Sequence, residues 1–425
     1  MRPNLRVAHI PAKSVGCILC LLASQAAALA GDWPSWRGPL RDAVARETGL
    51  LAEWPDGGPP LKWKIDGLGG GYSSIAISSG RIMTIGNRDG TAVLIALDQT
   101  SGNELWAAAV GPGEPNCTPT IDNGRVYALG REGDLVCVEA KSGRELWRRH
   151  LGNDFGGRMM SGWGYSESPL VDGDRLICTP GATDAVLLAL DKHSGDVVWK
   201  APAPSGGTTR GTAGAGYSSV VVSNACGVRQ YVQLAGQGLI SAAADDGRLL
   251  WTYNRIANGT ANIPTPIIDG DHVFCSSGYG TGAALLKVIA RDGNVGIEEV
   301  YFLPAKTMQN HHGGMVLVDG YIYCGHGHND GFPICLEMKT GKVAWRGGRG
   351  PGSGSAAVLH ADGHLYFRYE DGVMALIATR PDTYQLKGQF RLATVNGKSW
   401  PHPVIADGLM YLRDQQTLLC YDVRR

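Results

Sequence analysis

The sequence has no excess of either charge sign and no long run of basic residues. Among its 425 residues, 39 lysines and arginines balance 39 aspartates and glutamates, so the formal net charge is zero. Nucleic-acid-binding domains need a basic surface, so we expect no nucleic-acid partner. After the first 30 residues no apolar stretch suggests a transmembrane segment, and no two cysteines are adjacent, which excludes a disulfide between neighbouring residues.

The first 30 residues have the pattern of a secretory signal peptide. Basic residues precede a short apolar stretch at 15–22, and Ala28-Leu29-Ala30 forms a small-x-small cleavage site before Gly31. The apolar stretch is too short to span a bilayer. We therefore predict an exported, soluble protein, periplasmic or extracellular; the alternative is that these residues form a buried helix of the fold.

One phrase of eleven residues recurs along the rest of the chain. It reads small residue, any residue, Asp or Glu, three residues, Gly, three residues, Trp. The copies lie at residues 96–106, 137–147, 189–199 and 335–345. Four copies in one chain indicate a repeat architecture.

Each repeat predicts a small antiparallel sheet. Alternating apolar strands are separated by Asp-Gly turns such as Asp319-Gly320 and Asp407-Gly408, which are typical of hairpins. The 61 glycines also favour many short strands over long helices. Four strands in a unit of about 40 to 50 residues are typical of a propeller blade.

The number of units predicts eight blades. Seven complete units follow Tyr72, whereas the unit that begins at Trp400 lacks a fourth strand. Leu61-Lys62-Trp63 looks like the missing strand, and pairing it with the last unit would leave no unpaired edge in the ring. We predict an all-β, eight-bladed propeller over residues 61–425, closed by an N-terminal strand that completes the C-terminal blade.

Residues 31–60 do not follow the repeat. They are rich in Trp, Pro and Gly, and we predict an irregular extension that lies over a surface of the propeller. Trp33, Trp36 and Trp54 are expected to be buried against that surface.

The repeated tryptophan is predicted to be structural. A buried indole removes roughly 150–250 Å² from water, so it can hold neighbouring blades together. The docking residues are Trp63, Trp106, Trp147, Trp199, Trp251 and Trp345.

The cysteines after residue 30 mostly follow the same repeat. Small buried fillers are the preferred interpretation, because cysteine is among the most buried residue types. Export would permit disulfides. Cys324 and Cys335 could face each other across one hairpin and are the best candidate pair.

The repeated phrases at residues 96–106 and 189–199 resemble the tryptophan-docking motif of quinoprotein-type propellers, the PQQ-binding-like β-propeller repeat superfamily. This superfamily includes dehydrogenases that use pyrroloquinoline quinone and the propeller scaffold of outer-membrane protein assembly. The resemblance covers the chain from about Leu61 to its end. With the Trp-Pro-Ser-Trp-Arg-Gly-Pro segment at 33–39, the whole arrangement resembles exported propellers of planctomycete-type bacteria.

The resemblance implies what a catalytic relative would carry. Quinone-dependent members have a ring disulfide between adjacent cysteines, a Glu/Asn/Asp set for calcium and base catalysis, and in some cases a C-x-x-C-H haem site. Here the only C-x-x-C, Cys17 to Cys20, lies in the leader and is not followed by His. Pyrroloquinoline quinone with calcium therefore remains a possible cofactor only with a divergent site.

The axial loops of a propeller gather on one face, where a rigid scaffold presents binding residues. The repeat register places candidate ligand-binding residues there, with Tyr72, Asn116, Trp163 and Tyr165 nearby. The candidates are Arg158, Glu167, Tyr217, Asn262, Asn310, His311, His312, His326, His328 and His402.

Unit six concentrates four of the eleven histidines on this face. Imidazole is the commonest metal ligand, and three histidines with an open position form a catalytic zinc pattern. The candidate set for a divalent metal is His312, His326, His328 and Asp330, with His311 as the alternative to His312. A ligand site without metal and a purely structural loop region are the competing interpretations.

Three functions follow from these observations. The first is a non-catalytic scaffold that binds an unidentified ligand or protein on the axial face, and for it we expect a monomer. The second is a quinone-dependent alcohol or sugar dehydrogenase with a divergent site. The third is a metal-dependent enzyme that uses the histidines of unit six.

Overall fold

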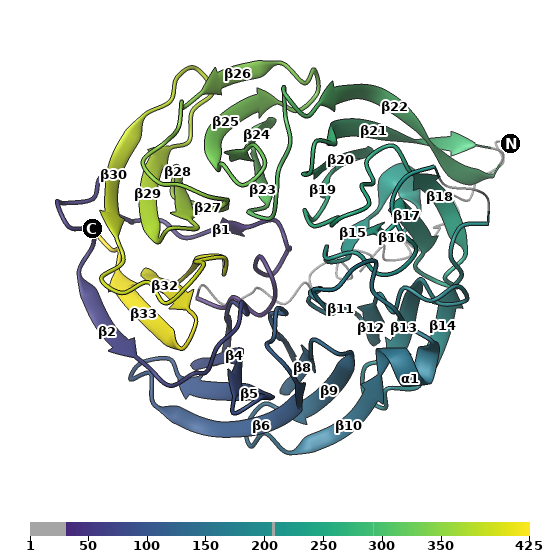
Figure 1. The fold of residues 1–425 in the computed structure, drawn as a ribbon, viewed down its shortest axis with the longest axis horizontal. Helices are drawn as coiled ribbons and strands as arrows, with labels where there is room; N and C mark the ends of the chain where they lie inside the picture. Colours follow the sequence, from purple (N-terminus) through teal and green to yellow (C-terminus); the bar gives the residue numbers. More distant parts are fainter. Residues whose placement is uncertain (1–30, 206–208, 292) are drawn as a thin grey trace, which may run out of the picture.

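The computed structural model describes residues 31–205, 209–291 and 293–425. Its strands form eight sheets arranged side by side around a central axis (Figure 1). Seven of these sheets have four strands and one has five. The predicted all-β, eight-bladed propeller is confirmed. The predicted signal peptide lies outside the described residues.

The blades are numbered along the chain, and within each blade the strands run from the axis outward. Blade one has β3 (Ala76–Ser78), β4 (Arg81–Arg88), β5 (Thr91–Asp98) and β6 (Glu104–Pro112). Blade two has β7 (Thr120–Asp122), β8 (Arg125–Leu129), β9 (Asp134–Glu139) and β10 (Glu145–His150). Blade three has β11 (Leu170–Asp172), β12 (Arg175–Cys178), β13 (Leu187–Asp191) and β14 (Val197–Ala201). Blade four has β15 (Val221–Ser223), β16 (Gln230–Ala235), β17 (Gly238–Ala243) and β18 (Leu249–Tyr253).

The second half of the ring repeats this order. Blade five has β19 (Ile267–Asp269), β20 (His272–Ser277), β21 (Gly282–Arg291) and β22 (Asn294–Pro304). Blade six has β23 (Met315–Val318), β24 (Tyr321–His326), β25 (Phe332–Glu337) and β26 (Val343–Arg346). Blade seven has β27 (Ala356–Ala361), β28 (His364–Tyr369), β29 (Val373–Ala378) and β30 (Leu386–Arg391). Blade eight has β31 (Val404–Ala406), β32 (Leu409–Asp414), β33 (Thr417–Asp422) and β2 (Leu61–Ile65).

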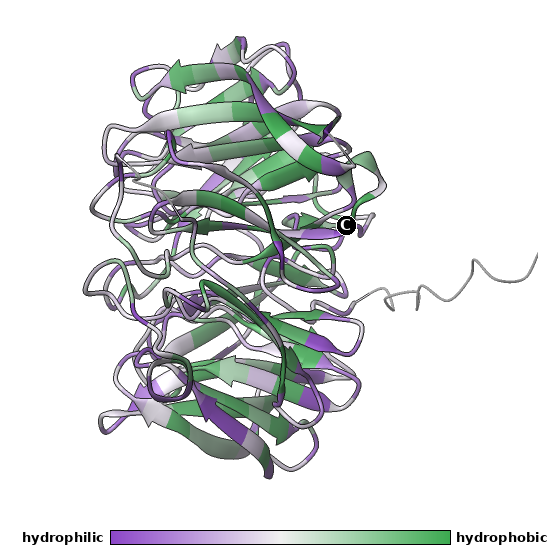
Figure 2. Ribbon diagram, turned by 90° about the vertical axis from the view of Figure 1, so that its right-hand side faces the viewer, coloured by the Kyte–Doolittle hydropathy of each residue, from purple (hydrophilic) through white to green (hydrophobic). Residues whose placement is uncertain are grey.

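Helix contributes little to the described structure. Two short pieces connect blades or strands: α1 (Leu151–Phe155) and the 3-10 turn η1 (Ala225–Gly227). No helix in the described ranges is long and apolar enough to cross a membrane. Apolar residues concentrate along the strands, while polar residues gather in the loops at the two faces (Figure 2).

The ring closes through its N-terminal strand. β2 pairs antiparallel with β33, so Trp63 lies opposite Cys420 in the last blade. Arg413 on β32 then reaches into blade one, where its guanidinium donates to Ile85 O at 2.9 Å and to Gly69 O at 3.0 Å. Strand β2 and the side chain of Arg413 therefore both stabilise the closure of the ring at blade eight.

In blades one, two, three, five and six, docking aromatics link the blade to the next one at the outer radius. Their ring donors reach a backbone carbonyl of the following blade in Trp106 to Ala140, Trp147 to Lys192, Trp199 to Ala244, Tyr301 to Met338 and Trp345 to Arg380. A Cβ on Gly195 would lie 2.8 Å from Trp147 Cε3, so this turn needs glycine for the stacked indole as well as for its φ of 74°. Trp251 differs, because its indole donates to Gln230 Oε1 within its own blade at 2.7 Å.

A second set of links joins the blades at the axis. In each of blades one to four, the residue two positions before the first strand donates its backbone N–H to the side-chain hydroxyl at the same position of the next blade. These bonds run from Ser74 N to Thr118, Thr118 N to Ser168, Ser168 N to Ser219 and Ser219 N to Thr265, at 3.0–3.4 Å. We call Ser74, Thr118, Ser168, Ser219 and Thr265 the hydroxyl ring. In blades six, seven and eight the equivalent position of the repeat is Gly314, Ala357 and His402.

Residues 33–45 cross the axis of the propeller, and β1 (Val44–Ala45) pairs parallel with β27 on the inner side of blade seven (Figure 1). We call residues 33–45 the axial segment. Its backbone and side chains bond to innermost strands or the residues just before them: Trp33 to Ile77, Pro34 to Ile121 and Arg41 to Ser168 and Pro169. The prediction that all of residues 31–60 lie over a surface was wrong for this part. An eight-sheet ring leaves space at its axis, and the axial segment occupies it.

Arg37 anchors the axial segment where the hydroxyl ring is interrupted. Its guanidinium donates to Met315 O and to Asp42 O. Gly314 makes room for it, because a Cβ there would lie 2.6 Å from Arg37 Nη1 and 3.0 Å from His402 Cε1. The φ of Gly314 is 72°, which also favours glycine.

The proposed disulfide is not formed. Tyr323 pairs with Cys335, and Cys324 pairs with Ile334. The two cysteines are thus one residue out of register, and neighbouring positions of a strand point to opposite faces. All eight cysteines after residue 30 are free, and seven of them are buried.

Truncating a docking tryptophan should destabilise the ring. Trp199 is only 7% exposed, so Trp199→Ala loses its packing and its hydrogen bond and is expected to cost about 3–5 kcal/mol of unfolding free energy. Val197→Ala on the same strand is the matched control, because Val197 is 46% exposed. Denaturant unfolding of both variants tests this; equal effects would contradict the docking role.

Gly314 and Arg37 should be energetically coupled. Gly314→Ala is expected to destabilise by about 1–3 kcal/mol through overpacking and the positive φ. In an Arg37→Ala variant the clash between the new Cβ and the Arg37 guanidinium disappears. The loss of unfolding free energy caused by Gly314→Ala should therefore be smaller by at least about 0.5 kcal/mol. A double-mutant cycle of unfolding free energies measures this, and strict additivity would show that the two residues do not compete for space.

Candidate functional site

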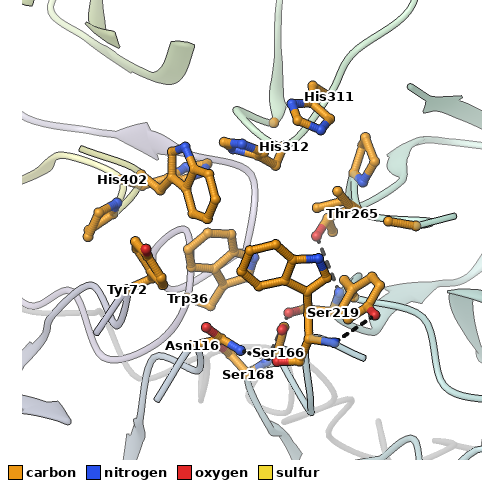
Figure 3. Close-up of a pocket in the computed structure, with 18 of the residues that line it drawn as sticks. Trp36, Tyr72, Asn116, Ser166, Ser168, Ser219, Thr265, His311, His312 and His402 are labelled. Atoms are coloured by element: carbon orange, nitrogen blue, oxygen red, sulfur yellow. Dashed lines mark hydrogen bonds between the residues drawn. The ribbon is translucent and has the colours of Figure 1, made fainter. Parts of the chain in front are cut away.

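A cavity of about 460 Å³ opens on the face where the loops lead into the innermost strands. We call it the axial pocket. Trp36 and Arg37 of the axial segment line it from within the ring (Figure 3). Arg37 also borders a second cavity, of about 540 Å³, that lies among the first strands of blades three to six. The axial segment therefore separates the two cavities.

The wall of the axial pocket consists of two layers of equivalent residues. The inner layer includes Ser168, Ser219, Thr265, Gly314 and His402, the residues at the hydroxyl-ring position. The outer layer lies two residues earlier in each blade and includes Tyr72, Asn116, Ser166, Tyr217, Ile263, His312 and Trp400. Residues two apart on an extended strand share a face, so both layers point toward the axis.

Aromatic rings form a nearly continuous lining. Trp400 contacts Tyr72, His312 and Trp163, with ring centroids 4.6, 4.6 and 6.0 Å away. Trp36 packs on His402 at 4.4 Å. Trp163 is 52% exposed and lies at the mouth of the pocket.

Blade six continues this lining with three histidines, which lie beside Tyr279 in the β20–β21 loop of blade five. His311 lies 4.3 Å from His312, 4.6 Å from His328 and 5.2 Å from Tyr279, between ring centroids. His311 Nδ1 is 2.7 Å from Ser355 Oγ, and its Nε2 is 3.1 Å from the Tyr279 hydroxyl. The loops of blades five and six thus supply an ordered aromatic wall.

The pocket carries little free charge. No aspartate or glutamate is among the described residues that line it. The Arg37 guanidinium donates to backbone carbonyls, and Lys398 pairs with Glu370 at 2.8 Å. Burial lowers the pKa of His311 to about 4 and that of His402 to about 3. Both imidazoles are therefore neutral near pH 7.

The structure brings half of the predicted binding residues to this pocket. Tyr217, His311, His312, His328 and His402 line it, together with Tyr72, Asn116 and Trp163. The other five predicted residues, Arg158, Glu167, Asn262, Asn310 and His326, do not line it.

The predicted residues that do not line the pocket make other contacts or lie elsewhere on the surface. Glu167 lies between Ser166 and Ser168 of the two layers, so its side chain points away from the pocket. Its carboxylate accepts hydrogen bonds from Thr179 and Gln233. Burial raises the pKa of Glu167 to about 7. Asn262 donates to Ala235 O and Gly236 O.

Asn310 is also a structural tie, because its amide donates to Gly314 O and Gly325 O. The Arg158 side chain is exposed and borders a different, much smaller cavity.

The predicted metal set is not brought together. His326 ends β24 and its Nδ1 accepts from Gln309 N at 3.2 Å, whereas His312 and His328 face the pocket. Gly327, with a φ of 101°, turns the chain between His326 and His328, so the two do not share a side. Asp330 is exposed. Within residues 31–205, 209–291 and 293–425, no group of three or more His, Cys, Asp or Glu could hold a metal ion.

The sequence reasoning missed several lining residues. Trp400 occupies the same register position as Tyr217, so the repeat alignment could have identified it. The same alignment could have identified Ser168, Ser219 and Thr265. Trp36 could not be placed, because the axial segment has no counterpart in the repeat.

The described lining does not fit the cofactor of the quinone-dependent relatives. Calcium prefers several oxygen ligands, usually including carboxylates, and the described lining contains no carboxylate. Pyrroloquinoline quinone carries three carboxylates, whereas the described pocket has only two cationic groups, of which Lys398 already pairs with Glu370. The lining is suited to an uncharged group.

Comparison with known proteins identifies a family. The family described as outer membrane protein assembly factor BamB matches residues 89–347. The assembly factor BamB of Nitrosomonas eutropha is 23% identical over 279 residues, which cover 63% of this chain and 59% of that protein. The tetrathionate hydrolase of Acidithiobacillus ferrooxidans is 28% identical over 170 residues, covering 39% of this chain and 32% of that protein. The chain thus spans less than two thirds of the length of these curated relatives.

Solved structures show the same fold at low identity. BamB from Moraxella catarrhalis superposes with a TM-score of 0.59 at 15% identity, covering 85% of this chain and 97% of that one. Quinohemoprotein alcohol dehydrogenase from Comamonas testosteroni superposes with a TM-score of 0.64 at 12% identity, covering 92% and 80%. At these identities the likeness concerns the fold alone.

The neutral histidines should make stability depend on pH. Histidine in an unfolded chain titrates near 6.5, and burial lowers the pKa of His402 to about 3. The native state therefore favours the neutral imidazole, and the associated stability is present above pH 6.5 and lost as the pH falls toward 3. His402→Phe should reduce the drop in melting temperature between pH 7.5 and pH 4.5 by about 2–4 °C.

Differential scanning fluorimetry measures this effect. Because the pH-dependent change in melting temperature of the variant is compared with that of the unmodified protein, contributions of other titrating groups such as Glu167 cancel. His193→Phe is the matched control, because the His193 side chain is 46% exposed. An unchanged pH dependence in His402→Phe would contradict the buried neutral imidazole.

Proposed function

The chain belongs to the family of the outer membrane protein assembly factor BamB, and from this premise we propose that it is an exported, non-catalytic propeller that acts as a binding scaffold. The axial pocket is the binding site in this proposal. The observation that carries it is the pocket itself: an open cavity lined by aromatic rings on a rigid ring of blades.

The polar groups of the pocket support binding rather than catalysis. The nearest approach to a nucleophile and base is Ser355 with His311. Ser355 is only 5% exposed, and the second nitrogen of His311 meets a tyrosine hydroxyl instead of a carboxylate. A pKa of about 4 also makes His311 a weak general base near neutral pH.

Export to the periplasm or an equivalent compartment is part of the proposal. The signal-peptide pattern of the first 30 residues supports it, and so does the relationship to proteins named for outer-membrane protein assembly. Whether this chain takes part in such assembly is a separate question, because the alignments cover only part of those relatives.

Photocrosslinking in cells tests the binding site. Trp163 is replaced by p-benzoylphenylalanine, which puts the reactive group at the pocket mouth without disturbing the core. We expect a covalent adduct with a non-self molecule, identified by mass spectrometry. The matched control carries the same group in place of Val197, on the outer face of blade three.

Two results would overturn the proposal. One is equal labelling at both positions, which would show that the pocket is not a preferred site. The other is turnover of alcohols or sugars by the purified protein with added pyrroloquinoline quinone and calcium, which would show that the protein is an enzyme.

A further inference from the structure

Three hydroxyl groups face the axial pocket with a hydrogen to donate. The oxygens of Ser168, Ser219 and Thr265 each accept a backbone N–H from the preceding blade, at 3.0, 3.0 and 3.4 Å. Each oxygen therefore already accepts one hydrogen bond, while its own hydroxyl hydrogen remains available for donation. The described residues offer no acceptor for these hydrogens, so a bound molecule with oxygen acceptors would satisfy all three.

The opposite wall carries nitrogen atoms without partners (Figure 3). His402 is 6% exposed, and neither of its ring nitrogens makes a hydrogen bond of normal geometry, the backbone of His312 being its nearest polar neighbour. The Nε2 atom of His312 is also buried without a partner. A neutral imidazole has one donor and one acceptor, and leaving them unpaired in a buried position is costly. A ligand hydroxyl can both donate and accept, so it suits either nitrogen.

The distribution of charge argues against an ionic ligand. The described lining has no carboxylate to bind a cation, and its two cationic side chains are already occupied by carbonyls and by Glu370. Binding a cation here would remove its water without supplying a counter-charge, which is strongly unfavourable. An anion would have to compete with Glu370 for Lys398 and with backbone carbonyls for Arg37. The ligand class that fits is neutral and rich in hydroxyl groups.

The exposed aromatic rings favour a ligand with flat apolar faces. Trp163 and Trp400 lie 6.0 Å apart at 67°, and Tyr72 lies 4.6 Å from Trp400. A pyranose ring presents C–H groups on its faces and hydroxyls around its edge. Such a ring can cover Trp163 with a face while its edge reaches the polar groups deeper in the pocket.

We propose that the axial pocket binds a neutral saccharide, with Trp163 and Trp400 stacking against sugar rings and with Ser168, Ser219, Thr265 and His402 bonding to sugar hydroxyls. This inference rests on the proposed function and names its ligand class. The cavity of about 460 Å³ is within the range of roughly 300–1,000 Å³ that small-molecule sites occupy.

Isothermal titration calorimetry tests the saccharide class. The probes are maltotriose, cellotriose and tri-N-acetylchitotriose, with trigalacturonate as a charged trisaccharide. We expect at least one neutral probe to bind at least about tenfold more tightly than trigalacturonate. Trp163→Ala should weaken that binding by about tenfold or more, whereas Leu105→Ala, at a residue 48% exposed on β6, should leave it unchanged.

The hydroxyl ring provides an internal control. Thr265→Val and Thr118→Val each remove an acceptor for a backbone N–H, but only Thr265 lines the pocket. Thr265→Val should therefore weaken saccharide binding by about fivefold or more, and Thr118→Val by less than about twofold. Equal effects of the two variants would mean that the hydroxyls act only in the structure, which would overturn their role in the proposal.

The outcomes separate this inference from the function on which it rests. If none of the neutral probes binds at millimolar concentration, or if binding is unaffected by Trp163→Ala, the saccharide proposal fails. If the crosslink at position 163 still forms with another molecule, the proposed scaffold function stands. If neither binding nor crosslinking occurs, both proposals fail.

Discussion

A ring of eight sheets leaves space between its innermost strands, and the form of this molecule depends on how that space is filled. The axial segment crosses it and divides it into two cavities that share Arg37. The segment is held by backbone bonds to several blades and by the gap that Gly314 leaves in the hydroxyl ring. The axial pocket is therefore made by the same packing that fills the axis of the ring.

The blades are fixed to one another at two radii, and this accounts for the order of the pocket. At the outer radius an indole of one blade donates to a carbonyl of the next, as Trp147 does to Lys192. At the axis a backbone N–H of one blade donates to a hydroxyl of the next, as Ser168 does to Ser219. The outer links combine a hydrogen bond with the packing of a buried indole, whereas the inner links at Ser168, Ser219 and Thr265 leave hydroxyl hydrogens directed at the pocket. The scaffold and the site thus use the same serine and threonine side chains.

Much of the fold could be predicted from the sequence because the repeat carries it. The docking phrase and the Asp-Gly turns identified the blades, and the orphan strand at Leu61 identified the closure. The site was predicted only in part. Register placed Tyr217 and His312 correctly, but Glu167 lies one position away and points into the joint between blades three and four. The axial segment occurs once, so no pattern could reveal its path, and the cysteine pair depended on a one-residue register that the sequence does not specify.

The position of β2 has a consequence for the order in which the molecule forms. β2 precedes all the other strands of the propeller blades, yet its partner β33 follows all of them. β2 therefore has no partner until β33 has been made, so blade eight depends on two segments that are far apart in the sequence. Contacts between such distant residues form slowly. In each of the other seven blades the four blade strands are consecutive in the chain, whereas the axial pocket combines Trp36 of the axial segment with Trp400 of blade eight and is completed after them.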